Sequence, residues 1–550
     1  MDGYQRLIDA LPVRLPPGRS HRVNEKVTRE AVAGLPLANP AQAAREVEQI
    51  LDGMLATSWP GGERIAALEH LRVPVAVLCA GIGREVGVES HPLPQAVSDK
   101  AATAQRLQEK LASGYAIGLH ELCAPAGKLP RFKGKLAAVA AVRGLLHANH
   151  ALLWACHRYL APPTGLWRRA HALYAFAGEL GIADQVVEDT VAEGMPCNAR
   201  DAYAHLLLFA IGNPYRFSAR ELDEAWQVCR CLASLCMLAR AGGEGIGVDT
   251  DADSGPGYIP EERLTAGAGV IAIDIGSAQR ALDERAALLP RGVDVIDLPR
   301  PGGGRVTTNT HFLRRLCTGW GNAPRGHARL DAAHALDIVV GMHALHYALA
   351  GNLDFASFVR RVRGDAIMLG QHDLPSAWME MSDAAHPRVF RSEVLDQSQG
   401  GYRMRLAVVD GLRLRIGEVV GLAPVVEGSD QRDWMVGVIR WLRREDESVL
   451  LGIELLHREA RAAGVRAMTM TGAALTPQRA VELLDGEQEL LSLLVSHPFA
   501  GNVTAAEVVL PKLASDWRSQ AAVGKWRPDE VETLGPTCFR VTLVRDDDER

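Results

Sequence analysis

The first 240 residues repeat their hydrophobic positions at the spacing of an α-helix. Short breaks such as Pro162-Pro163-Thr164-Gly165 separate the periodic segments, which are 41–54, 101–111, 132–160, 166–180, 199–211 and 218–239. Ser218 and Glu221 place a Ser-x-x-Glu capping signature at the start of the last segment. Long helices joined by short breaks predict antiparallel hairpins that pack on one another. We therefore expect an all-α domain over 1–241, either a bundle or a solenoid-like stack.

After this region the pattern changes to short apolar runs between turn residues. A glycine- and aspartate-rich stretch opens a small α/β connector, which we expect over 242–310. Strands are predicted at 336–340, 388–395, 401–409, 418–426, 434–442 and 448–456. Their spacing is typical of an antiparallel β-barrel. The barrel domain is expected over 311–457, with an insertion at about 347–387.

The last ninety residues continue the β pattern. Strands are predicted at 490–495, 505–510 and 538–544, with one helix at 476–484, so 458–550 is expected to form a β-rich C-terminal unit. The predicted fold class is therefore multidomain α+β, in which a helical region precedes the barrel and the β-rich unit.

Composition narrows the function classes. Acidic residues outnumber basic ones, the net charge is −6, and the pI is about 6.3. A general DNA or RNA binder carries a basic excess, so we expect no nucleic-acid partner. No run reaches the roughly 18 apolar residues that cross a bilayer. The N-terminus also lacks the apolar core of a secretory signal. We expect no transmembrane segment and a cytoplasmic location.

Metal sites are not expected either. The nine cysteines show no disulfide framework, which favours reduced thiols. Cys229, Cys231 and Cys236 lie close together, but no second ligand pair follows them. The aspartates of 249–253 resemble the start of a calcium loop, yet Ser254 stands where that loop requires glycine. We interpret the cysteines as buried apolar residues and the aspartates as a solvated turn, and expect no metal and no cofactor.

One local motif is specific. A predicted strand runs into Asp396-Gln-Ser398-Gln-Gly400-Gly401, and a new strand starts at once. Aspartate, serine and glycine are also ordinary turn residues, so a simple hairpin remains one reading of this motif. The strands that follow carry glycines at Gly417, Gly437 and Gly452.

This segment resembles the PilZ domain, a small β-barrel family of bacterial cyclic di-GMP receptors. The family signature is Asp/Asn-x-Ser-x-x-Gly, matched here by Asp396, Ser398 and Gly401, together with an earlier Arg-x-x-x-Arg. The earlier half is matched by Arg325 and Arg329, which precede the first predicted barrel strand. The resemblance covers about 320–457. The distance between the two halves exceeds the few tens of residues usual in the family, which requires the insertion.

The resemblance implies cyclic di-GMP as the ligand, with Arg325, Arg329, Asp396, Ser398, Gly400 and Gly401 as its site. Arginine can bind guanine O6 and N7 in a bidentate manner, stack on a purine, or pair with phosphate. Aspartate can accept from guanine N1–H and N2–H₂. Glycine lets the ligand approach the backbone closely. Arg440 and Arg443 are candidates for auxiliary phosphate contacts, or else belong to a solvated strand end.

Three functions remain open at this point. The first is a receptor that couples cyclic di-GMP binding to an unknown protein partner of the helical region. The second is a helical scaffold whose barrel is degenerate and no longer binds. An enzyme is the least favoured, because the sequence has no phosphate-binding loop, no nucleophile elbow and no zinc-protease motif. Arg325 and Arg329 close to Asp396 in the fold would favour the receptor over the scaffold.

Overall fold

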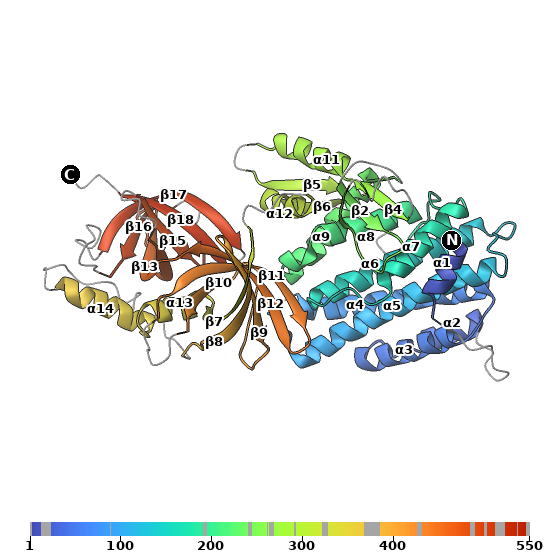
Figure 1. The fold of residues 1–550 in the computed structure, drawn as a ribbon, viewed down its shortest axis with the longest axis horizontal. Coiled ribbons are helices and arrows are strands. Elements are labelled where there is room, and N and C mark those ends of the chain that lie inside the picture. The colour runs from blue at the N-terminus through green and yellow to red at the C-terminus, as the bar shows by residue number, and fades with distance from the viewer. Residues whose placement is uncertain are drawn as a thin grey trace. The chain divides into compact units, whose positions relative to one another are not determined.

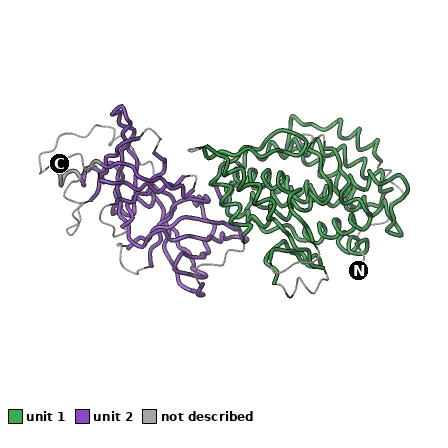
Figure 2. Tube along the Cα trace, turned by 90° about the horizontal axis from the view of Figure 1, so that it is seen from above, with its two compact units in different colours: residues 1–89, 93–324 green, residues 90–92, 325–550 purple. Residues whose placement is uncertain are grey.

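The computed structural model describes residues 3–12, 24–87, 90–189, 191, 195–239, 245–260, 262, 269–290, 293–321, 328–367, 386–425, 432–484, 490–499, 503–511, 523–535 and 537–545. The chain divides into two compact units (Figure 2). Unit 1 comprises 1–89 and 93–324, and unit 2 comprises 90–92 and 325–550.

Unit 1 is built on long antiparallel helices (Figure 1). They are α1 (Gly3–Ala10), α2 (Glu25–Ala33), α3 (Pro40–Ala56), α4 (Gly61–Val86), α5 (Gln95–Cys123), α6 (Gly134–His157), α7 (Leu166–Glu179), α8 (Ala199–Ile211) and α9 (Ala219–Leu232). Helix α5 packs between α4 and α6. The predicted capping box at Ser218 and Glu221 starts α9.

Helix α6 forms the centre of this bundle. It is apolar on nearly all sides, which is the pattern of a helix surrounded by others. Helices α4 and α6 are long and apolar enough to cross a membrane by length and composition alone. In the structure 83% of the most apolar stretch of α6 is buried inside the unit, and 50% of that of α4. Both helices therefore pack in the bundle. The expectation that no apolar stretch reaches this length is not met by α4 and α6.

A four-stranded sheet, a two-stranded sheet and the helices α11 and α12 follow in unit 1. The four-stranded sheet has the order β1-β4-β2-β3, and β5 pairs with β6. The elements are β1 (Met237–Ala239), β2 (Gly245–Asp249), β3 (Gly257–Ile259), β4 (Val270–Asp274), α11 (Gly276–Ala287), β5 (Val295–Pro299), β6 (Arg305–Asn309) and α12 (Thr310–Trp320). The barrel domain was predicted to begin at 311, but α12 lies in unit 1. There its buried Trp320 donates an indole hydrogen bond to the Leu208 carbonyl.

The first barrel of unit 2 is closed and antiparallel, with the strand order β10-β11-β12-β9-β8-β7. Its strands are β7 (Leu330–Val340), β8 (Phe390–Ser398), β9 (Gly401–Ala407), β10 (Val419–Pro424), β11 (Met435–Glu445) and β12 (Ser448–His457). The predicted insertion begins within α13 (Met342–Leu349) and contains α14 (Phe355–Ile367), and its residues 368–385 lie outside the described residues. The predicted α+β fold with a helical region and a barrel is confirmed.

The C-terminal unit is a second closed barrel with the order β13-β14-β15-β18-β17-β16. Its strands are β13 (Ala460–Thr469), β14 (Gln478–Leu483), β15 (Leu490–Val495), β16 (Val503–Val509), β17 (Val523–Gly535) and β18 (Cys538–Arg545). Numbered from its own first strand, this barrel has the same strand order as the first one. The predicted helix at 476–484 is wrong, because 478–483 is strand β14 between β13 and β15.

The two barrels of unit 2 share a hydrophobic core. Trp434 and Val436 of the first barrel pack with Val481 and Leu534 of the second. Helix α13 takes part through Leu345, which belongs to the same cluster. Backbone also meets backbone there, because a methyl group built on Gly535 would lie 2.3 Å from Gly417 Cα. The barrels therefore form one packed unit.

We expect Gly535→Ala to destabilise unit 2. The added methyl cannot fit against the Gly417 backbone, and overpacking of this kind costs about 1–3 kcal/mol. Urea unfolding of the full chain measures the effect as a lower midpoint. The control is Val531→Ala on the same strand, where the side chain is exposed and the change should be nearly neutral. An unchanged midpoint for Gly535→Ala would contradict the tight contact between the barrels.

Candidate functional site

The predicted motif lies on the hairpin of β8 and β9 (Figure 1). Ser398 pairs with Gly401, so the turn between the strands consists of Gln399 and Gly400. The same register places Asp396 opposite Arg403. Cross-strand partners point to one face of a sheet, so these two side chains lie together.

This face is the outer face of the barrel. Val394 and Met404 pair with each other and are fully buried, so they point into the barrel. Arg403 and Arg405 alternate with Met404 along β9 and face outwards. A bulge between Val394 and Asp396 brings the Asp396 side chain onto the face of Arg403.

Gly401 is required by the backbone. Its φ is +152°, a conformation that side chains other than hydrogen rarely adopt. A Cβ at this position would lie 1.9 Å from the Ile453 carbonyl oxygen on β12. The neighbouring Gly400 accepts a 2.9 Å hydrogen bond from the Leu455 N–H. The two glycines therefore let the turn lie flat against β12.

Asp396 is the centre of a charge cluster. The Arg329 Nη1 donates a 2.5 Å hydrogen bond to Asp396 Oδ1, and the Arg403 Nε lies 2.6 Å from Oδ2. The Asp396 side chain is only 8% exposed, whereas those of Arg329 and Arg403 are 37% and 42% exposed. A carboxylate this buried needs paired cations, since a partner lost from such a pair costs about 3–5 kcal/mol. Arg329 and Arg403 each approach a different oxygen of Asp396, and Asp331 pairs with Asp396 from β7, so both signs of charge meet at this point of the face.

Arg403 keeps hydrogen-bonding capacity. Its Nε lies close to Asp396 as an ion pair but is not aligned to donate a hydrogen bond. The Ser398 hydroxyl, two residues from Asp396 on the same face of β8, has no hydrogen-bond partner among the described residues. The Ser398 hydroxyl and the exposed part of the Arg403 guanidinium are therefore available to a bound ligand.

An indole extends this face. Arg403 pairs with Gly452 on β12, and Gly452 pairs with Trp441 on β11. A Cβ on Gly452 would lie 1.8 Å from the Trp441 Nε1, so the indole ring covers the bare backbone of Gly452. Trp441 is half-buried, whereas Trp434 is buried in the core. The outer face thus offers a flat aromatic ring beside the cluster of Asp396.

The structure brings the two halves of the motif together. Arg329 and Asp396 are 67 residues apart in the sequence and form a direct ion pair. Ser398, Gly400 and Gly401 lie on the same hairpin. The remaining predicted residue of this set, Arg325, falls outside the described residues.

The auxiliary arginines have other surroundings. Arg440 donates to Glu454 Oε2 at 2.6 Å and to the Leu534 carbonyl at 2.7 Å, so it links the first barrel to the second. We assign it a structural role in place of the auxiliary phosphate contact suggested by the sequence. Arg443 is exposed on β11 opposite Leu450.

Sequence reasoning missed Arg403 and Trp441. Arg403 could have been found, because a two-residue turn after Ser398 fixes its pairing with Asp396. Trp441 could not have been found in this way. Its place over Gly452 depends on the register of β11 and β12, which includes a shift between Ile439 and Trp441 that no local pattern indicates.

Metal chemistry has no support at this site. Within the ranges that the structure describes, no group of histidine, cysteine and acidic side chains could hold a metal ion. The predicted acidic turn instead holds loops of unit 1. Asp253 accepts hydrogen bonds from the Gly165 and Arg168 N–H groups, and Asp251 pairs with Arg6.

Comparisons with known proteins agree with this geometry. Residues 26–241 match the family described as "Cyclic-di-GMP receptor FimW, N-terminal domain", and 248–388 and 371–462 match "Cyclic-di-GMP receptor FimW, middle PilZ domain". A curated relative, the cyclic-di-GMP receptor FimW of Pseudomonas aeruginosa, is 24% identical over 489 residues. The alignment covers 80% of this chain and 78% of the relative. The resemblance to the PilZ domain is confirmed.

We expect Gly401→Ala to damage the site through the backbone. The new methyl would overlap the Ile453 carbonyl, so the β8–β9 hairpin must move away from β12. Such a clash and the unfavourable φ together should cost about 2 kcal/mol or more of unfolding free energy. Urea unfolding provides the measurement. Gln399→Ala, at an exposed position of the same turn, is the control and should change little; equal stability of the two variants would contradict the close approach.

Proposed function

We propose that this chain, part of which matches the PilZ domain of a cyclic-di-GMP receptor, is a receptor that binds cyclic di-GMP on the outer face of its first barrel. The observation that carries the proposal is the ion pair between Arg329 and Asp396. Each residue belongs to a different half of the motif, and a degenerate barrel would have no reason to keep them in contact. The relative whose name describes a cyclic-di-GMP receptor supports the same ligand.

The residues of the site match the parts of this ligand. The Asp396 carboxylate can accept hydrogen bonds from guanine N1–H and N2–H₂. For this, one of its two arginine partners must give way to the base. The arginine released, Arg329, can then pair with a phosphate or stack on a guanine. The exchange keeps the buried carboxylate compensated, because the guanine donors replace the guanidinium.

The other side of the face can hold the second part of the ligand. The Arg403 side chain is partly exposed, so its guanidinium can reach a phosphate, and the Trp441 ring lies over Gly452, one strand beyond it. Stacking of a base on an aromatic ring contributes about 1–3 kcal/mol. The Ser398 hydroxyl is available to phosphate or base on the hairpin side.

Coupling to a protein partner is the second part of the proposal. Arg329 immediately precedes β7, and the chain reaches it from α12. Helix α12 is fixed in unit 1 through Trp320 and through the ion pair of Arg315 with Glu221. A ligand that removes Arg329 from Asp396 therefore acts on the chain segment that joins α12 to β7. Such a switch needs only a different ligand affinity for the two arrangements.

The proposed role includes no chemical step on the ligand. The site offers arginines, one carboxylate and a hydroxyl, and the carboxylate is already paired with two cations. We expect cyclic di-GMP to be recovered intact after incubation with the protein, as measured by chromatography.

Titration calorimetry of the full chain tests the ligand site. We expect cyclic di-GMP to bind wild type and to lose at least about tenfold in affinity in Asp396→Ala and in Arg329→Ala, since each removes one group of the site. Arg405→Ala is a matched control. Arg405 also faces outwards on β9 and pairs with Glu393 at 3.0 Å, but it lies one step away from the cluster. Loss of affinity in Arg405→Ala equal to that in Arg329→Ala would contradict the site.

Base selectivity gives an independent prediction. Cyclic di-AMP lacks the N1–H and N2–H₂ donors, so it should bind wild type more weakly than cyclic di-GMP. In Asp396→Ala the difference between the two ligands should shrink, because the group that reads the guanine edge is gone. Competition between the two ligands, followed by calorimetry, measures the ratio. An unchanged ratio in Asp396→Ala would exclude Asp396 as the guanine reader.

Amide hydrogen exchange tests the switch. Cyclic di-GMP should change the exchange rate of amides in the first residues of β7, where Leu330 and Asp331 pair with Gln397 and Asp396. The change should be absent in Asp396→Ala and present in Arg405→Ala. Ligand binding with no effect at β7 would leave the receptor but remove the proposed coupling.

A further inference from the structure

Unit 1 contains a large cavity that lies wholly within the helical bundle. Its volume is about 630 Å³, within the roughly 300–1,000 Å³ of small-molecule sites. The lining side chains come from α4, α5, α6 and α9. The motif on the barrel belongs to unit 2, so this cavity is a separate feature.

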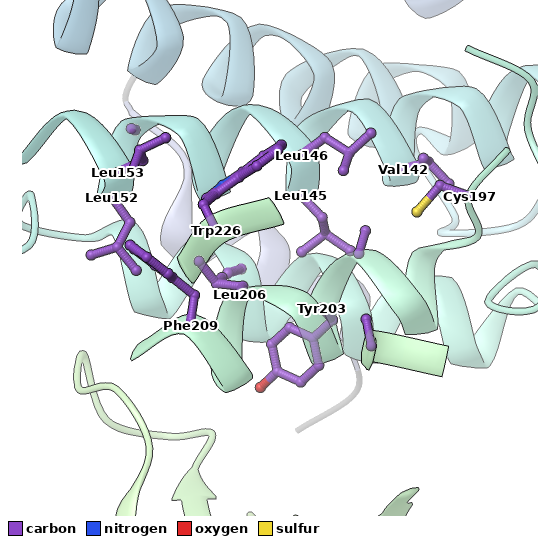
Figure 3. Packing of buried hydrophobic residues seen from close by; sticks show 14 of the residues in the cluster. Val142, Leu145, Leu146, Leu152, Leu153, Cys197, Tyr203, Leu206, Phe209 and Trp226 are labelled. Atoms are coloured by element: carbon purple, nitrogen blue, oxygen red, sulfur yellow. The ribbon is translucent and has the colours of Figure 1, made fainter. Parts of the chain in front are cut away.

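The walls combine apolar and aromatic surface. Val75 and Cys79 of α4 face Leu146 and Leu153 of α6 across the cavity. Two indoles, Trp154 on α6 and Trp226 on α9, also line it. Figure 3 shows Trp226 beside α6, among Leu145, Leu146 and Leu153. Flat aromatic side chains of this kind favour a ligand that contains a planar ring.

Buried polar atoms of the lining lack partners. The Trp226 Nε1, the Gln227 Oε1, the His147 Nε2 and the Arg72 Nε make no hydrogen bond to any described residue. Trp226, His147 and Arg72 are each more than nine-tenths buried. An unsatisfied buried polar group costs about 1–3 kcal/mol, and such groups normally have a partner. Several such groups gathered around one cavity mark it as a polar region within a mainly apolar bundle.

The unsatisfied atoms include both donors and acceptors. The Trp226 N–H is a donor. His147 is neutral, because burial lowers its pKa well below the ordinary value, and its Nδ1 lies 2.7 Å from the Gln108 Oε1. That contact assigns the proton to Nδ1, so Nε2 is an acceptor that faces no donor. The Gln227 Oε1 is a second acceptor. Polar groups of both kinds therefore surround the cavity.

The charge of the lining favours an anion. Among the described lining residues are five arginines, Arg72, Arg84, Arg143, Arg220 and Arg230, against two aspartates, Asp189 and Asp223. Asp189 is shared by Arg72 at 2.6 Å and Arg143 at 2.9 Å. Arg84 and Arg220 are exposed and form no ion pair with a described residue. The two of them place unpaired positive charge at the mouth of the cavity.

We infer that this cavity is a second ligand site, which binds a small anionic molecule with a planar heteroaromatic ring. The ring packs against the aromatic and apolar lining, among the polar side chains that surround the cavity. The carboxylate or phosphate of the ligand pairs with Arg84 and Arg220 at the mouth. A mononucleotide and an aromatic carboxylic acid share this chemistry, and the experiment distinguishes them.

The experiment uses the full chain with Asp396→Ala, so that the barrel site does not contribute. The probe is 1-anilinonaphthalene-8-sulfonate, an anionic aromatic dye whose fluorescence rises on transfer from water. We expect binding to one site on the folded protein. Displacement by GMP identifies a nucleotide site, and displacement by indole-3-acetate identifies a site for an aromatic acid.

Two pairs of variants locate the site. Gly83→Leu fills the cavity, because Gly83 lines it and a Cβ there would lie 3.9 Å from Trp154, an ordinary contact. Gly81→Leu, on the same helix, has nothing within 4 Å of its Cβ and is the matched control. We expect Gly83→Leu to weaken dye binding at least tenfold and Gly81→Leu to leave it unchanged. Arg84→Glu with Arg220→Glu should weaken it severalfold, whereas Arg45→Glu on α3 should not.

Clear results would overturn the inference. Equal dye affinity in Gly83→Leu and Gly81→Leu, with both proteins folded by circular dichroism, would exclude the cavity as the site. Displacement by uncharged indole as strong as that by indole-3-acetate would exclude the anion requirement. Displacement by neither GMP nor indole-3-acetate would exclude the proposed ligand class.

Discussion

The pairing of one buried carboxylate with two arginines organises the functional face of this protein. Asp396 is nearly inaccessible to solvent, and a charge so placed is tolerated only with compensating partners. Arg329 provides one partner from the beginning of the barrel, and Arg403 provides the other from the next strand. Because the partners can be exchanged for ligand donors, the same constraint that holds the apo site together also prepares it to bind.

The two barrels show why the fold alone does not define the function. The two barrels share one strand order, yet only the first has the motif Asp-x-Ser-x-x-Gly at the end of its second strand. After β14 the sequence reads Asp485-Gly-Glu487, so glutamate stands where the motif has serine. The second barrel instead contributes packing surface, through Leu534 and Gly535, to the first. The barrel architecture thus occurs twice, but the candidate ligand site occurs only in the first barrel.

Much of this arrangement could be predicted from local sequence. Turn residues and alternation defined the barrel strands, and the hairpin motif identified Asp396 and Ser398. Short apolar runs were ambiguous, however. The segment 476–484 was predicted as a helix, and only its pairing with β13 and β15 makes it a strand. Helix α12 was assigned to the barrel domain because nothing in its sequence shows that Trp320 is buried in unit 1.

The residues that prediction missed depend on register and long-range packing. Trp441 reaches its place through pairing with Gly452, and the cavity of unit 1 gathers side chains from four helices. No periodic pattern indicates that polar atoms of Trp226 and His147 remain unsatisfied there. Such features depend on which elements pack together in the tertiary structure, and no local sequence pattern indicates them.

A double-mutant cycle tests the central claim most directly. The affinity for cyclic di-GMP is measured by calorimetry for wild type, Arg329→Ala, Asp396→Ala and the double variant. If the two residues form one ligand site, their effects are non-additive, with a coupling free energy above about 0.5 kcal/mol. Additive effects, or a wild-type protein that does not bind cyclic di-GMP, would contradict the account.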